Sequence, residues 1–159
     1  MRQVFESENI SFVKVTEELL QDYLTLINDR DTAWWIGHLT EPVTEEAETQ
    51  WIRDKLDSKA RIWSMIEKKT GDFIGNIELM DIRDAAGEMG IAVTAEKQDM
   101  GFGTEAIKSL MEYATDCLGL RRIFLKAYPE NARAIHVYEK CGFCEYDRNE
   151  NDVFLEIFR

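Results

Sequence analysis

The sequence contains few of the residues from which metal sites and disulfide frameworks are built. It has three cysteines and two histidines, and none of them has the paired spacing of a zinc site. Cys141 and Cys144 form a Cys-x-x-Cys pair, but they stand at a predicted helix-to-strand turn without the βαβ context that a redox motif needs. We therefore expect reduced structural thiols and no metal.

Long apolar runs are also missing. No stretch approaches the roughly 20 apolar residues of a membrane span, and the first residues, Met1 to Glu8, lack the apolar run of a signal peptide. With only 2 prolines and 9 glycines, the composition is that of a compact protein without disordered linkers. At 159 residues, we expect residues 1–159 to form a single domain that resides in the cytoplasm.

Basic residues are scarce relative to acidic ones. The chain has 31 acidic and 19 basic residues, which gives a formal net charge of −12. Such a field repels nucleic acid and anionic membrane surfaces, so we expect neither as a partner. It attracts cations, which is a weak indication of an amine substrate. Nothing in the sequence decides whether the chain forms a homo-oligomer.

Hydrophobic periodicity and capping signals predict an α/β protein with seven strands and four helices. The predicted order is strand, two helices, three strands, helix, strand, helix, two strands. In residue numbers this is a strand at 13–15, helices at 16–27 and 44–56, strands at 61–67, 73–80 and 88–93, a helix from about 103 to 114, a strand at 122–128, a helix at 131–140, and strands at 143–146 and 153–157.

A glycine-rich loop, Gln98–Thr104, connects a predicted strand to a predicted helix. Glycines let the backbone approach a ligand closely, and the free N–H groups of a helix N-terminus attract phosphate. With Ala106 as its last position the loop also fits the dinucleotide fingerprint, but too little chain precedes it for a doubly wound sheet. On the spacing alone, a plain turn into a helix stays open as well.

Two segments at this separation carry a family resemblance. Val93–Ala106 and Asn131–Phe143 together resemble the GNAT superfamily of N-acetyltransferases, and within it the branch of ribosomal-protein N-terminal and spermidine acetyltransferases. The resemblance implies a mixed, mainly antiparallel sheet of about six to seven strands flanked by about four helices. It implies acetyl-coenzyme A as co-substrate, and direct attack on its thioester by a primary amine of a small molecule, a polyamine or a protein N-terminus.

The resemblance also implies which residues bind the cofactor. They lie on one strand, on the glycine loop that follows it, and at the start of the helix predicted at 131–140. They are Ile91, Ala92 and Val93 beside the pantetheine arm, Gln98, Asp99, Met100, Gly101, Phe102, Gly103 and Thr104 around the pyrophosphate, and Asn131 on the helix predicted at 131–140. Arg133 on the same helix is a further candidate for cofactor binding because of its charge. Asp99 and Met100 depart from the family pattern, which often has glycine or a basic residue there. An acid beside a pyrophosphate is unfavourable, and Lys97, Lys108 or Arg133 can offset it.

Acetyl transfer needs a neutral amine, stabilisation of an oxyanion, and a proton for the departing thiolate. Tyr138 matches the family tyrosine beside the thioester sulfur, and a tyrosine pKa of about 10 lies above a thiol pKa of about 8.5, so we expect it to be the acid. A backbone N–H near Val93 would stabilise the oxyanion. Glu88 is our candidate for the base. Glu78 on the neighbouring strand is the alternative base and a candidate for binding the substrate, and on the sequence alone either can be a solvated strand residue.

Trp34 and Trp35 stand in the segment where the family shapes its acceptor pocket, so we expect them to contact the substrate, although such aromatic pairs are often core. The alternative function is a non-catalytic module that binds acyl-coenzyme A as a sensor or interaction domain. The presence of Tyr138 favours catalysis. The hypothesis of a nicotinamide-dependent enzyme is supported only by the glycine spacing, and the predicted order of strands and helices does not fit it.

Overall fold

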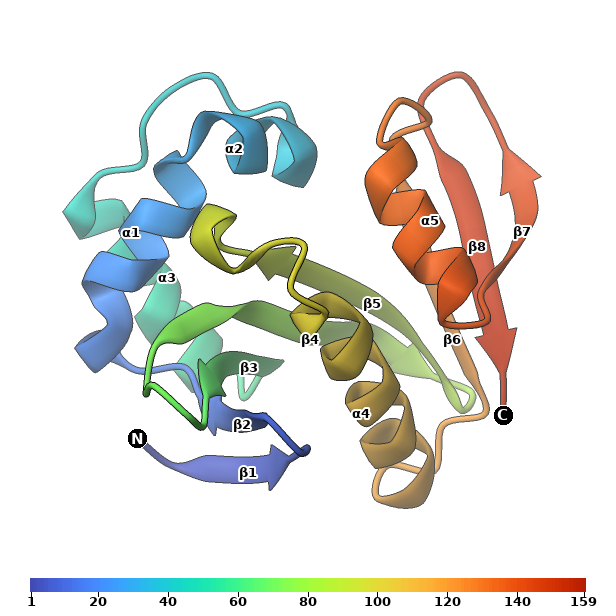
Figure 1. Cartoon of the computed structure of the whole chain (residues 1–159), viewed down its shortest axis with the longest axis horizontal. Coiled ribbons are helices and arrows are strands. Elements are labelled where there is room, and N and C mark those ends of the chain that lie inside the picture. The colour runs from blue at the N-terminus through green and yellow to red at the C-terminus, as the bar shows by residue number, and fades with distance from the viewer.

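The computed structural model describes all 159 residues and contains one mixed sheet of eight strands (Figure 1). The strands are β1 (Gln3–Glu6), β2 (Ile10–Lys14), β3 (Arg61–Glu67), β4 (Phe73–Arg83), β5 (Ala86–Val93), β6 (Arg122–Ala127), β7 (Cys144–Arg148) and β8 (Val153–Phe158). Their order in the sheet is β1-β2-β3-β4-β5-β6-β8-β7. Only the central pair, β5 and β6, is parallel, so the prediction of a mixed, mainly antiparallel sheet is confirmed.

Five α-helices surround the sheet, joined by the short 3-10 segments η1 (Glu17–Leu19) and η2 (Ala95–Lys97). The helices are α1 (Leu20–Asn28), α2 (Arg30–Gly37), α3 (Glu45–Asp57), α4 (Phe102–Asp116) and α5 (Ala132–Lys140). Thr44 begins α3 as predicted, because its hydroxyl accepts a hydrogen bond from the Ala47 N–H at 3.1 Å. None of these helices is both long and apolar enough to cross a membrane.

Two elements, β1 and α2, were not predicted, and there is a physical reason why each was missed. Strand β1 has four mostly exposed residues, so it carries no alternation of apolar and polar side chains. Helix α2 contains Trp34 and Trp35, which we assigned only to an apolar patch. The preceding polar residues end α1, but they also start α2, because the Asp29 carboxylate accepts a hydrogen bond from the Thr32 N–H at 3.0 Å.

The sheet is covered on both faces. Helix α4 crosses one face in front of β4 and β5 (Figure 1), where Ile107 and Leu110 pack with Met89 in the larger core cluster. Helices α1 and α3 cover the other face, where Tyr23 and Ile52 belong to the second cluster. Because strand side chains alternate, the residues that neighbour Met89 on β5 face the side of α1 and α3.

Strands β5 and β6 separate along their length. They pair only from Ala86 and Arg122 to Glu88 and Phe124, whereas β5 stays paired with β4 as far as Val93. Figure 1 shows the two strands diverging toward the ends that carry η2 and α5. We call this separation the β5–β6 fork. Beyond Glu88, one edge of β5 has no strand partner for its backbone N–H and C=O groups.

Candidate functional site

The glycine loop lies at the open end of the fork, between η2 and the first turn of α4. Gly101 has a φ of +87° and is the N-cap residue of α4. Because glycine has no side chain, it cannot cap the first N–H groups of the helix. A Cβ atom added at Gly101 or at Gly103 would meet no atom within 4 Å. The start of this 15-residue helix thus has no capping side chain and has free space at Gly101 and Gly103. Uncapped N–H groups at a helix N-terminus are an arrangement that can bind an anion.

Arg133 connects this loop to α5 across the fork. One guanidinium nitrogen donates to Gln98 Oε1 at 2.8 Å, and another lies 3.1 Å from Asp99 Oδ1. The Gln98 amide in turn donates to the Val93 carbonyl oxygen at 2.9 Å. We expected the backbone of Val93 to lie beside the pantetheine arm. Its carbonyl oxygen already accepts a hydrogen bond from the Gln98 side chain.

Arg133 is also the cation that offsets the acid of the loop. Lys97 is held elsewhere, with its Nζ atom 2.7 Å from Glu67 Oε2 and 2.9 Å from Asp72 Oδ2. The pair of Arg133 and Asp99 is exposed on both sides, with relative side-chain exposures of 52% and 80%. An exposed pair stabilises the fold little, so its main effect is on the local charge of the loop.

Helix α5 contributes Asn131 and Tyr138. The Asn131 Oδ1 atom accepts a hydrogen bond from the Ala134 N–H at 3.3 Å and caps the helix. The Tyr138 ring is half-buried against Phe143, with the ring centroids 6.2 Å apart. Burial, reinforced by the Cys141 thiol, raises the pKa of Tyr138 to about 12. The hydroxyl therefore keeps its proton at every physiological pH.

Two carboxylates of the opposite face stand close to the fork. Glu88 is the last residue of β5 that pairs with β6, and it is half-buried. Burial raises the pKa of Glu88, and the charges of Asp81 and Glu78 raise it further, whereas Lys126 lowers it. Glu78 differs because its Oε2 atom lies 3.2 Å from Lys55 Nζ. Glu88 is thus the carboxylate without an ion pair.

Aromatic side chains reach across the open end of the fork from α2. Trp34 and Trp35 are 47% and 37% exposed. The Trp34 ring stacks on His38 with centroids 4.0 Å apart, and His38 stacks on Tyr128, which follows β6, at 3.9 Å. Trp35 lies 6.3 Å from the same tyrosine. Sequence reasoning missed His38 and Tyr128, because no spacing pattern relates two residues that only the fold brings together.

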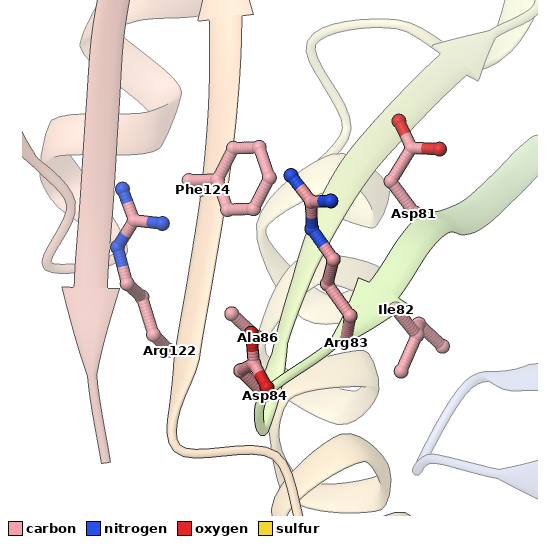
Figure 2. Close-up of a pocket in the computed structure, with 7 residues that line it drawn as sticks. All are labelled: Asp81, Ile82, Arg83, Asp84, Ala86, Arg122 and Phe124. Atoms are coloured by element: carbon pink, nitrogen blue, oxygen red, sulfur yellow. The ribbon is translucent and has the colours of Figure 1, made fainter.

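A hollow of about 700 Å³ lies at the closed end of the fork. Seven residues line it: Asp81, Ile82, Arg83, Asp84, Ala86, Arg122 and Phe124 (Figure 2). The Arg122 guanidinium is fixed 2.7 Å from Glu156 and 4.6 Å from the Phe124 ring centre. Phe124 is in register with Glu88, so the hollow adjoins the carboxylate at the fork. Sequence reasoning did not predict it.

The structure thus brings most predicted site residues to one fork in the sheet. The loop and Tyr138 come from elements on the side of α4, and Glu78 and Glu88 stand on the side of α1 and α3. A strand edge without a partner, a glycine loop at a helix N-terminus and a tyrosine opposite form a geometry that suits an extended, phosphate-bearing ligand lying along a strand.

Comparisons with known proteins identify the family of the chain. Residues 9–144 match the family described as the acetyltransferase (GNAT) domain. The chain is 29% identical over 113 residues to a spermidine N(1)-acetyltransferase of Vibrio cholerae, which covers 70% of this chain and 63% of that protein. It is 36% identical over 87 residues to a spermidine N(1)-acetyltransferase of Escherichia coli, which covers 54% of this chain and 47% of that protein.

A solved structure confirms the fold. The spermidine N-acetyltransferase of Vibrio cholerae, solved in complex with CoA and spermine, superposes with a TM-score of 0.84 at 22% identity over 96% of both chains. The chain belongs to the GNAT acetyltransferase domain family. The matched segment spans about half to two thirds of the length of the two curated relatives, 47% and 63% respectively.

Proposed function

We propose that the protein is an acetyl-coenzyme A-dependent N-acetyltransferase that acetylates a primary amine. The observation that carries this proposal is the β5–β6 fork. It joins the glycine loop at the N-terminus of α4 and Tyr138 on one side of the sheet to an unpaired carboxylate, Glu88, on the other. The names of the two curated relatives support an amine as the acceptor.

The residues present fit the co-substrate. The open space at Gly101 and Gly103 accommodates a pyrophosphate against the N-terminus of α4. The free edge of β5 at Ile91 and Ala92 offers backbone groups to the amide-containing arm, as a strand does to an added strand. Bound there, the co-substrate supplies an activated acetyl group as a thioester.

Each residue near the fork then has a chemical task. Glu88 accepts a proton from the ammonium of the acceptor, directly or through water, so that the neutral amine attacks the thioester carbonyl. Backbone N–H groups of β5 stabilise the oxyanion. The Tyr138 hydroxyl donates to the sulfur as the carbon–sulfur bond breaks. The ammonium loses two protons as it becomes an amide. Glu88 takes the first and passes it to solvent, and the second, released from the tetrahedral intermediate, replaces the proton that Tyr138 gave to the sulfur. The reaction therefore releases one proton to solvent and leaves the enzyme unchanged.

The raised pKa of Tyr138 refines the role expected from the sequence. A hydroxyl with a pKa of about 12 is a weaker acid than a thiol with a pKa of about 8.5. Complete proton transfer from Tyr138 to the thiolate therefore costs free energy. This cost is recovered only when the amine releases a proton that reprotonates Tyr138. Its hydrogen bond stabilises the charge that develops on sulfur in the transition state.

A thiol-release assay with purified protein and acetyl-coenzyme A tests the proposal. The panel should contain polyamines, aminoglycosides, amino acids and N-terminal peptides. We expect at least one amine to stimulate thiol release above the rate without acceptor. A protein that binds the cofactor tightly but releases no thiol with any amine would be the non-catalytic binding module instead.

The glycine loop gives a graded test of the cofactor position. We expect Gly103→Ala to weaken coenzyme A binding slightly and Gly103→Leu to weaken it by about tenfold or more, because each side chain extends into space that no protein atom occupies. Thermal stability should not fall, since alanine in a helix is about 0.5–1 kcal/mol better than glycine. Calorimetry that shows unchanged affinity for both variants would place the pyrophosphate elsewhere.

Removing the acid of the loop should tighten the cofactor. Asp99→Asn deletes a negative charge near the phosphates and releases Arg133 from its pair. The affinity for coenzyme A should rise by a few-fold, and the gain should shrink as salt rises, because the charges are exposed. A loss of affinity at low salt would instead mean that Asp99 holds the loop in its left-handed conformation (φ +59°).

The rate should depend on the ionisation of Glu88. Because its pKa is raised, kcat/KM should fall as the pH drops through a value above the ordinary range for glutamate. Glu88→Gln should remove this limb and lower kcat/KM at pH 7 by about tenfold or more, with a smaller deficit at high pH where the free amine is neutral. An unchanged pH–rate profile would assign the base to another group.

The same variant should fold normally. A raised folded-state pKa means that the ionised Glu88 carboxylate costs stability above that pKa, and that this cost disappears as the pH falls below it. Glu88→Gln removes the cost, so its melting temperature at pH 7 should equal or exceed that of the parent. Lower activity together with lower stability would point to damage to the sheet rather than to loss of a base.

A further inference from the structure

A chain of hydrogen bonds runs through the buried face beneath α1 and ends at Asn76. The Thr16 N–H donates to the Tyr23 hydroxyl oxygen at 3.2 Å. The Tyr23 and Ser64 hydroxyls are 2.6 Å apart, and Ser64 Oγ lies 2.8 Å from Asn76 Oδ1. Tyr23 is 1% exposed and Ser64 is fully buried, so neither hydroxyl can use bulk water.

The number of available protons fixes the direction of this chain. Tyr23 has one proton, and Ser64 is the only acceptor among its partners, because its other partner is an N–H group. Tyr23 must therefore donate to Ser64. Ser64 then has its own proton left, and it donates this proton to Asn76 Oδ1. The opposite direction would leave the Tyr23 proton buried without a partner, which costs about 1–3 kcal/mol.

The Asn76 amide is consequently held in one orientation, with its NH₂ group directed away from Ser64. This NH₂ group makes no hydrogen bond within the chain and is not fully buried. Asn76 is in register with Ala92, on the part of β5 that has no β6 partner, and directly opposed strand residues have Cβ atoms about 5 Å apart. The fixed donors thus lie one strand away from the edge where the acetyl group is expected.

We propose that Asn76 is a specificity-determining residue, which donates a hydrogen bond to an oxygen atom of the acceptor close to the reacting amine. This inference rests on the proposed acetyltransferase activity. An NH₂ donor repels an ammonium group and pairs with a carbonyl or hydroxyl oxygen. On the same face Glu78 is already paired with Lys55 at 3.2 Å, which weakens its attraction for a second cation. The acceptor is therefore an amine that bears an oxygen, rather than a simple polyamine.

Two matched acceptors test this inference. Alaninamide carries a carbonyl next to its amine, and 1,2-diaminopropane has the same carbon skeleton with a methylene group and a second amine instead. We expect the parent to prefer alaninamide in kcat/KM. Asn76→Asp keeps the size and the bond from Ser64 but replaces the donor with a carboxylate oxygen. It should lower kcat/KM for alaninamide by about tenfold, mainly through KM, and raise it for the diamine.

Asn76→Leu serves as the control variant, because it removes the polar group without offering a charge. It should lower kcat/KM for alaninamide and leave the diamine within about threefold of the parent. Melting temperatures of both variants should be compared with the parent, since a purely structural role for Asn76 would lower both rates together and would not invert the preference.

The outcomes separate the inference about Asn76 from the acetyltransferase proposal. If the parent acetylates spermidine or the diamine in preference to alaninamide, or if Asn76→Asp leaves the ratio of the two unchanged, the inference about Asn76 is wrong while the acetyltransferase proposal stands. If the parent acetylates no amine at all, both are wrong. An inverted ratio in Asn76→Asp, with cofactor affinity unchanged, supports both.

Discussion

Tyr138→Phe should lower kcat by about 10²-fold or more, the scale usual for a lost proton donor. The substitution removes only the hydroxyl, which makes no hydrogen bond within the chain, and it keeps the ring that packs against Phe143. The affinity for coenzyme A and the melting temperature should therefore stay close to those of the parent. Steady-state kinetics at saturating cofactor, together with calorimetry, would measure both quantities.

Two results would contradict this role for Tyr138. Full turnover in the phenylalanine variant would mean that the thiolate leaves without its help, and the tyrosine would be an ordinary packing residue. A loss of cofactor affinity with unchanged kcat would make the hydroxyl a binding contact. Burial of the ring alone cannot explain a selective loss of kcat, because phenylalanine buries the same ring.

Gly75→Ala should destabilise the fold by about 3 kcal/mol, the upper end of what an overpacked site usually costs. Gly75 is in register with Val93 on β5, and a Cβ added there would collide with the Ala92 carbonyl oxygen and lie 2.9 Å from Val93 Cα. Because these are backbone atoms, a change of side-chain rotamer cannot relieve the clash, and strand β5 itself must move. At this chain length the melting temperature should drop by roughly 6–12 °C.

Gly103→Ala is the matched control, because it adds the same methyl group where no atom lies within 4 Å. The Gly75 variant should also bind coenzyme A more weakly, since the displaced segment of β5 is the edge proposed to bind the pantetheine arm. A melting temperature for Gly75→Ala within about 2 °C of the parent would show that β4 and β5 can separate without cost, contrary to the close approach seen here.

Much of the fold was predictable because the relevant signals are local. The caps at Thr44 and Asn131 involve residues within three positions of each other. Strands β3 and β4 were identified by two apolar runs on either side of the turn at residues 70–72. Strand β1 and helix α2 were missed. The first buries too little to show a pattern, and the second starts only two residues after the end of α1, so a single polar segment carries both signals.

The candidate site was predictable only in part, since a motif covers neighbours in sequence and the site also combines distant ones. The loop from Gln98 and the helix from Asn131 were identified through the resemblance, and the structure brings them together through the bonds of Arg133. The stacking of Tyr128 on His38 joins residues 90 positions apart, and the chain that orients Asn76 includes a bond between Tyr23 and Ser64 across 41 positions. No periodicity records such contacts.

The central claim is that the fork transfers an acetyl group from a thioester to an amine. The most direct measurement is mass spectrometry of the products after incubating the protein with acetyl-coenzyme A and an acceptor, with free thiol measured in parallel. We predict one acetylated amine for each thiol released, and no comparable release with Tyr138→Phe. Thiol release without acetylated amine, or binding of the cofactor with no thiol released for any amine, would contradict it.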